Sequence, residues 1–213
     1  MKCVYAIINV GAEQAQERIH LMKFKDHKNI SRYLVKSHDR RIKARNRWAL
    51  IIGSVIPDIA FYTYFRGSFN GQKLKGHNYE NTSGLINHLI ENIESDNKFG
   101  VKRYFDIGKL LHYSADSFTF AHNSHFKGNI SAHRAYEMKL HERLEEAMSN
   151  NYAGIAYKGV SDMHARIKEL HDRYVLESPD CQTDCSYIMY VLRYLYSMLA
   201  IEGVSESEMT VAA

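Results

Sequence analysis

The chain has 213 residues, of which 45% are hydrophobic and 24% are charged, and its formal net charge is +4. This composition is ordinary for a soluble globular protein, and the length suits one domain with a substantial core. The small positive charge is compatible with an anionic lipid surface or a phosphate-bearing substrate, but it does not require nucleic acid as a partner.

Proline and cysteine are scarce, whereas histidine is abundant. Two prolines, Pro57 and Pro179, argue against a sandwich of short strands, and three cysteines provide no even set of disulfides. We interpret Cys181 and Cys185, four residues apart, as reduced thiols. The twelve histidines are the unusual feature of the composition, because histidine is the commonest metal ligand.

Two apolar segments raise the question of export or membrane insertion. The run from Val4 to Val10 is shorter than the core of a secretory signal, so we expect a cytoplasmic protein and regard secretion as the less favoured alternative. The longest apolar run, Trp48 to Phe65, contains Pro57 and Asp58. An aspartate at the centre of a membrane span costs about 3 kcal/mol, so we expect no transmembrane segment.

Apolar residues at helical spacing predict an all-α fold, a single domain of about seven helices around a metal cluster. The first predicted helix covers 29–47 and has a basic, solvated face. A buried apolar segment, 48–65, follows and should break at Ile56-Pro57-Asp58, before a polar loop over 66–80. We expect the later helices at 82–94, capped by Thr82 or Ser83, then at 101–118, at 131–148, capped by Ser131, and at 160–176 and 181–201.

Two short motifs carry the candidate chemistry. His112 and Asp116 lie four residues apart on one predicted helix, and His133 and Glu137 lie four residues apart on the next. Residues at this spacing share a helix face, so each pair offers an imidazole nitrogen and a carboxylate oxygen for zinc, which takes ligands of both kinds at about 2.0–2.2 Å. The alternative for one such pair is a surface ion pair. Two pairs close together favour a metal, because a cation offsets the cost of burying them.

Further histidines lie between and after the two pairs. His122 follows the end of the predicted helix, where the chain can turn back to supply a ligand, and His125 is its rival. His141, four residues after Glu137, is expected to donate a hydrogen bond to a ligand rather than to bind the metal itself.

The order of these residues resembles a known family. His112-Tyr113-x-x-Asp116, then His122 and Phe126, then His133-x-x-Tyr136-Glu137 are similar to the core motifs of the bacterial zinc-dependent phospholipase C family. Upstream, the segments around His27, Gly53-Ser54-Val55-Ile56-Pro57-Asp58 and His77 also resemble this family, so that the similarity covers roughly His27 to Glu146.

The resemblance implies two or three zinc ions and a role for each matching residue. His122, His133 and Glu137 would hold one zinc, Asp58, His77, His112 and Asp116 a second, and His27 with a bridging Asp116 a third. A metal-activated water would attack the phosphorus of a phospholipid, with Asp58 orienting or deprotonating it, and release diacylglycerol and a phosphorylated head group. Such a substrate also implies contact with a membrane surface.

Residues 1–21 do not match the family, so the domain is expected to span 22–203, with Met22 as an alternative start and 204–213 as a frayed tail. In the family's secreted prototype the mature N-terminus completes the third zinc site, and here 26 residues precede His27. Ile59 also follows Asp58 where that prototype has an aromatic contact, so a choline head group is not implied.

Two alternatives to a phospholipase remain open. The related zinc-dependent nucleases share the ligand plan and stack nucleic-acid bases on aromatic side chains, for which Tyr62, Tyr64, Phe65 and Tyr79 are candidates. The second alternative is a metal-binding helical protein without catalytic activity. It would explain the unmatched third site and the missing aromatic contact.

Overall fold

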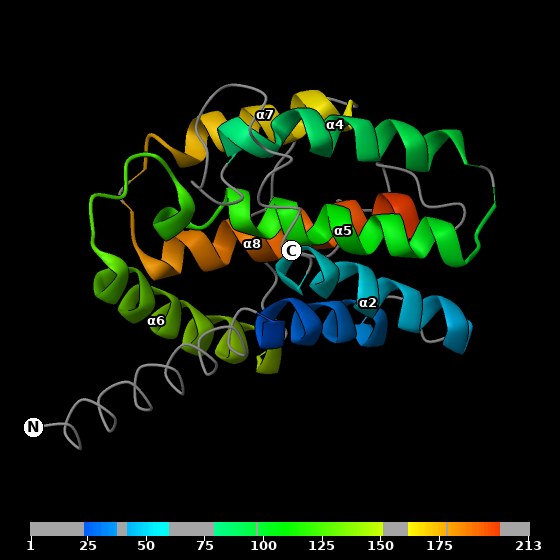
Figure 1. Cartoon of the computed structure of the whole chain (residues 1–213), viewed down its shortest axis with the longest axis horizontal. Helices are drawn as coiled ribbons and strands as arrows, with labels where there is room; N and C mark the ends of the chain where they lie inside the picture. Colours follow the sequence, from blue (N-terminus) through cyan, green and yellow to red (C-terminus); the bar gives the residue numbers. More distant parts are fainter. Residues whose placement is uncertain are drawn as a thin grey trace, which may run out of the picture.

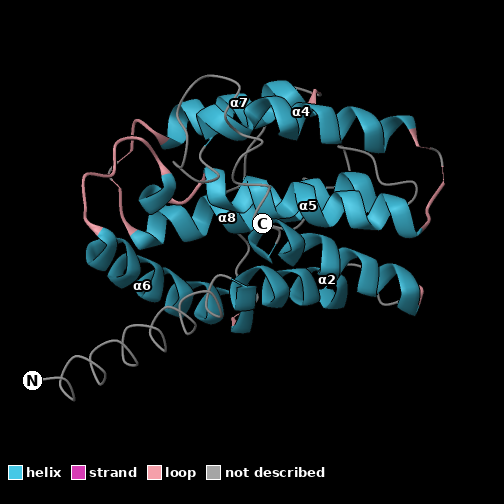
Figure 2. Cartoon of the chain, viewed as in Figure 1, coloured by secondary structure: helices cyan, strands magenta, loops and turns pink. Residues whose placement is uncertain are grey.

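The computed structural model describes residues 24–37, 42–59, 79–96, 98–150, 162–177 and 179–200. Their regular structure is helical, with no strand among them, which confirms the all-α prediction (Figure 2). A helix over 24–37 is followed by α2 (Ala44–Ile59), α4 (Tyr79–Ser95), α5 (Val101–Ser117), the short 3₁₀ helix η2 (Phe120–His122), α6 (Ile130–Ser149), α7 (Met163–Tyr174) and α8 (Cys181–Ala200).

Helix α5 lies in the middle of the fold. Figure 1 shows α4 and α7 on one side of it and α2 with the 24–37 helix on the other. Helices α2, α4 and α8 all pack against α5. Because buried residues occur on nearly every side of α5, it is a core helix rather than an amphipathic surface helix. Polar side chains on its last two turns are therefore buried with it.

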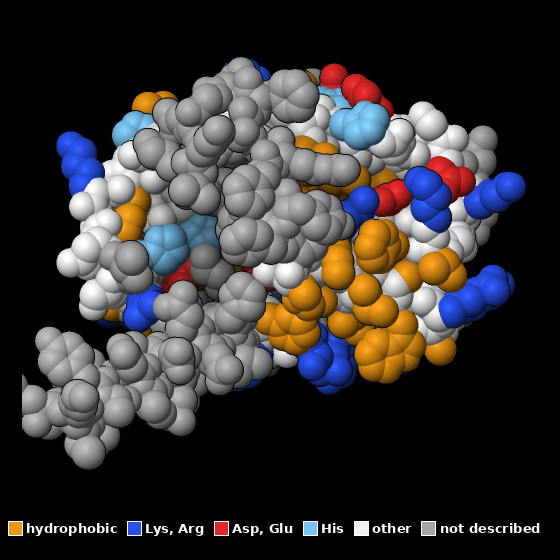
Figure 3. Space-filling model, in the orientation of Figure 1, with side chains coloured by type: hydrophobic (Ala, Val, Ile, Leu, Met, Phe, Trp, Pro, Cys, Tyr) orange, Lys and Arg blue, Asp and Glu red, His pale blue; other side chains and the backbone are white. Residues whose placement is uncertain are grey.

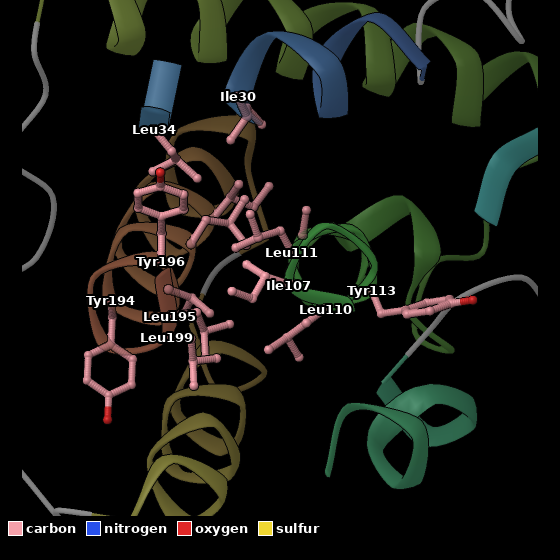
Figure 4. Packing of buried hydrophobic residues seen from close by; sticks show 14 of the residues in the cluster. Ile30, Leu34, Ile107, Leu110, Leu111, Tyr113, Tyr194, Leu195, Tyr196 and Leu199 are labelled. Atoms are coloured by element: carbon pink, nitrogen blue, oxygen red, sulfur yellow. The ribbon is translucent and has the colours of Figure 1, made fainter. Parts of the chain in front are cut away.

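The apolar core fills the space between α5, α8 and the 24–37 helix. In Figure 4, Ile107 and Leu111 of α5 point toward side chains of α8 such as Leu195, and Ile30 and Leu34 close the core from above. These side chains are almost completely shielded from solvent. Burial of each contributes about 1.5–3 kcal/mol, which fixes α5 relative to its neighbours.

Helices α2 and α5 approach each other unusually closely through two glycines. A Cβ atom on Gly53 would lie 2.1 Å from the backbone oxygen of Phe105, and one on Gly108 would lie 2.2 Å from that of Leu50. No side chain fits at either position, so the two backbones are in direct contact. This contact sets the distance between the last turn of α2 and the C-terminal half of α5.

Several predicted boundaries were wrong. The single helix over 29–47 is two helices, because Ile42 and Lys43 are not helical and α2 begins at Ala44. The predicted break at Ile56-Pro57-Asp58 does not occur, since Pro57 lies inside α2 and the helix continues to Ile59. Proline removes one hydrogen bond, to the carbonyl of residue 53. Packing of the buried face of α2 outweighs that loss.

The predicted caps were also misplaced. Helix α4 begins by Tyr79, so Thr82 is buried within it instead of capping it. Helix α6 is capped by Asn129, whose side chain accepts a hydrogen bond from the backbone N–H of Ala132, and Ser131 lies inside the helix. Asparagine and serine are comparable N-caps, so composition alone could not choose between them.

None of the described helices has both the length and the apolar character needed to span a membrane.

The glycine contact yields a stability prediction. We expect Gly108→Ala to destabilise the protein by about 1–3 kcal/mol, because its Cβ would collide with backbone that cannot rotate away. The matched control is Gly84→Ala in α4, where no neighbouring atom of the described residues lies within 4 Å of the added Cβ. That change should stabilise the helix by about 0.5–1 kcal/mol. Urea unfolding of both variants checks this, and equal effects would contradict the close approach.

Candidate metal centre

The C-terminal half of α5 carries the first pair of candidate ligands. His112 is completely buried and Asp116 is 5% exposed. The Nδ1 atom of His112 lies 3.0 Å from the backbone oxygen of Ser54 on α2. Donation of the Nδ1 proton to that oxygen leaves Nε2 with a free electron pair, directed toward the carboxylates of Asp58 and Asp116. A carbonyl that fixes the tautomer in this way is typical of metal-binding histidines.

Asp116 is surrounded by three histidines. Its Oδ1 atom lies 3.4 Å from Nε2 of His27. Its Oδ2 atom lies 3.4 Å from Nε2 of His112 and 3.6 Å from Nδ1 of His122. The two oxygens therefore face different histidines, and one carboxylate connects residues from the 24–37 helix, α5 and η2.

A second group lies where η2 meets α6. The Oε1 atom of Glu137 is 3.1 Å from Nε2 of His122 and 2.9 Å from Nε2 of His133. His133 and Glu137 share a face of α6, as their spacing predicted, and His122 reaches them from η2. Its other ring nitrogen faces Asp116, so His122 joins the two groups.

Asp58 occupies the last turn of α2, next to the first group. Its Oδ1 atom lies 3.7 Å from Nε2 of His112. Its Oδ2 atom is buried and has no hydrogen-bond partner among the residues that the structure describes. A buried carboxylate oxygen without a partner costs about 1–3 kcal/mol or more, so this atom is placed to bind a cation or a proton.

The donor set fits zinc. Ligand atoms of His27, His112 and Asp116 all lie within 4.8 Å of one another, and so do those of His122, His133 and Glu137. Tetrahedral zinc with bonds of about 2.1 Å separates its ligands by about 3.4 Å. The distances of 3.4 and 3.6 Å around Asp116 are close to this value, whereas Glu137 lies at hydrogen-bond distance from its two histidines. All donors are imidazole nitrogens or carboxylate oxygens, the ligands that catalytic zinc takes together.

The electrostatics of the first group also favour a cation. Burial raises the pKa of Asp116, but the neighbouring His122 and His112 outweigh burial and hold that pKa well below its usual range. Asp116 is therefore an anion, with a second carboxylate, Asp58, on the other side of His112. A buried anion at this position favours a bound cation.

The predicted residues differ in where the structure places them. Seven come together as described, and His77 lies outside the described residues. His125 is exposed, whereas its rival His122 is in the cluster. The ring of His27 lies 3.9 Å from that of His112, so among the described residues the expected second and third sites form one continuous group.

The spacing of His141 and Glu137 predicted a hydrogen bond from His141 to this ligand, but His141 has other partners. Its Nδ1 atom bonds to Asp26, and its Nε2 atom lies 3.4 Å from Glu145. Burial raises the pKa of Asp26. Because Asp26 precedes His27, this bond fixes the 24–37 helix against α6 at the edge of the first group.

One residue that sequence reasoning missed is Asp184, on α8. It is completely buried and accepts hydrogen bonds from the backbone N–H of Phe120 and from the hydroxyls of Tyr136 and Tyr174, at 2.8–2.9 Å. Burial raises its pKa to about 6, despite these donors. Phe120 begins η2, and Tyr136 precedes Glu137, so one carboxylate holds both segments that carry the second group. A lone aspartate on a helix with Tyr and Leu gives no signal for this role.

Comparison with known proteins identifies one family. Residues 26–181 match the family model described as zinc dependent phospholipase C, a span that contains all eight predicted ligands and lies within the predicted 22–203 domain. No curated protein and no solved structure matches the chain.

The position of Asp184 leads to a prediction about metal affinity. We expect Asp184→Asn to weaken zinc binding about tenfold to a hundredfold, because its amide cannot accept all three donors and the His122 segment loosens from Glu137. Competition with a chromogenic zinc chelator measures the change. Asp106→Asn is the control, since Asp106 pairs with Lys102 and Lys109 on α5 and should leave the affinity unaltered. Equal effects in both variants would contradict the role.

Proposed function

Because the chain belongs to the zinc-dependent phospholipase C family, we propose that it hydrolyses phospholipids to diacylglycerol and a phosphorylated head group. The observation that carries the proposal is the pair of ligand groups joined by Asp116 and His122. Enzymes that cleave phosphodiesters commonly place two metals side by side, so that the attacking and the leaving oxygens are both stabilised.

Seven of the described residues would hold the zinc. In this proposal His122, His133 and Glu137 bind one ion, and His27, His112, Asp116 and Asp58 surround the other position or positions. When bound, zinc lowers the pKa of water and neutralises the charge that develops on the phosphoryl oxygens. The hydrogen bond from His112 to Ser54 and the bonds to Asp184 keep these ligands oriented before substrate arrives.

Asp58 is the residue that we propose for proton transfer. Within the described part of the chain its buried Oδ2 has no hydrogen-bond partner, so this oxygen can orient the attacking water and accept its proton. Its Oδ1 faces His112, which keeps the carboxylate directed into the cluster. A general base positioned in this way contributes about 10²–10⁴-fold to the rate.

The first test is hydrolysis itself. We expect zinc-loaded protein to release diacylglycerol from phospholipid and a chelator to abolish the release. His133→Ala should remove most activity, because it takes one of three ligands from the second group. His88→Ala, which changes an exposed histidine of α4, is the matched control and should be as active as the wild type. Absence of turnover with every head group in zinc-loaded protein would refute the proposal.

The second test asks whether Asp58 transfers a proton or only binds zinc. We expect Asp58→Asn to lower kcat about 10²–10⁴-fold while the zinc content stays equal to that of the wild type, at both ligand groups. The side chain keeps its size, but its amide cannot take a proton from the attacking water. Metal analysis and kinetics on the same preparation check both parts, and unchanged kcat with full zinc would show that Asp58 transfers no proton.

The same assays decide between the alternatives. Cleavage of single-stranded DNA without release of diacylglycerol would favour a nuclease. Of the aromatic residues considered for base stacking, Tyr79 stacks on the ring of His171 at 3.8 Å, and Tyr62, Tyr64 and Phe65 lie outside the described residues. Full zinc occupancy without hydrolysis of any diester would favour a non-catalytic role.

A further inference from the structure

Helix α2 exposes an apolar stripe on its outer face. Trp48 is 57% exposed, Ile52 48% and Ile59 55%. Their spacing places all three on one side of the helix, with Arg45 at its first turn. The opposite side of α2 is buried against α5. A row of exposed apolar side chains on one helix face is a candidate interaction surface.

The surface continues onto α5 and has a basic margin. Val101 of α5 is 48% exposed, and Lys102 and Lys109 lie on the same helix. The acidic residue there, Asp106, pairs with both lysines, so the local charge stays positive. Figure 3 shows the hydrophobic side chains gathered over α2 and α5, with lysine and arginine side chains around them.

The metal centre lies next to the end of this stripe, because Asp58 in the last turn of α2 faces His112. Figure 3 shows histidine side chains with acidic side chains beside them, where η2 and α6 lie in Figure 1, on the face that also carries the apolar surface. Along the chain, Ile59 at the end of the stripe directly follows Asp58. A flat partner resting on the stripe would therefore extend toward the cluster.

We propose that Arg45, Trp48, Ile52, Ile59, Val101, Lys102 and Lys109 form the surface with which the protein docks on an anionic phospholipid bilayer. Tryptophan and isoleucine insert among the upper acyl chains, and the basic margin meets the negative head groups. A second copy of the chain fits this surface less well, because it would bring two basic margins together. This proposal rests on the proposed function, because docking would bring the metal centre to its phospholipid substrate. Binding to vesicles can nevertheless be measured without hydrolysis.

Trp48 provides the readout, because it is the only tryptophan of the chain. We expect its fluorescence emission to shift to shorter wavelength when zinc-loaded protein meets vesicles of equimolar phosphatidylglycerol and phosphatidylcholine. Vesicles of phosphatidylcholine alone should bind more weakly, and added salt should weaken binding to the anionic vesicles. Ile52→Ser should lower vesicle affinity about tenfold, and Arg45→Ala about fivefold. Both variants retain Trp48.

The control variant is Leu176→Ser, which removes an apolar side chain that is 86% exposed in the turn after α7, outside the docking surface. It should bind vesicles like the wild type. Hydrolysis of a water-soluble diester, bis(p-nitrophenyl) phosphate, should be equal in Ile52→Ser and the wild type, while vesicle hydrolysis falls in Ile52→Ser. Loss of docking with intact diester hydrolysis thus separates this proposal from the proposed function.

Three results would overturn the docking proposal. One is the absence of any emission shift or co-sedimentation with the anionic vesicles. Another is an equal loss of vesicle binding in Leu176→Ser and Ile52→Ser. The third is an emission shift that appears without lipid and grows with protein concentration, which would assign the surface to a second copy of the chain.

Discussion

The burial of Asp116 among three histidines is the constraint on which the rest of the structure depends. Its two oxygens face His27, His112 and His122, and a second carboxylate, Asp58, lies beyond His112. Burial of ionisable groups this close together costs free energy unless a cation lies among them. The surrounding helices hold these groups close together, in positions from which they can bind a cation.

The scaffold positions the cluster through backbone contacts as much as through side chains. The glycines that let α2 touch α5 bring Asp58 and the Ser54 carbonyl within reach of His112. On the other side, the Asp184 carboxylate joins η2 to α6. The ligands are therefore held by elements that are themselves anchored in the core, and substrate binding does not have to assemble them.

The sequence was sufficient where the information was local. Pairs such as His133 and Glu137 depend only on the helical repeat, so their shared face could be predicted. Whether His122 or His125 joined them could not, because the answer depends on how η2 turns back toward α6. Pro57 predicted a break that packing overrode, and Asp184 carries no local pattern at all. Tertiary contacts determine such features, and the local patterns of a single sequence do not predict tertiary contacts.

The chemical nature of the ligands offers the most direct test. X-ray absorption at the zinc edge reports which atoms surround the bound ion. We expect a shell of nitrogen and oxygen at about 2.0–2.2 Å, as the histidine and carboxylate groups require. A sulfur shell at about 2.3 Å would place the metal on the thiols of Cys181 and Cys185 instead, and that result, or protein that retains no zinc after dialysis, would contradict a metal centre at Asp116.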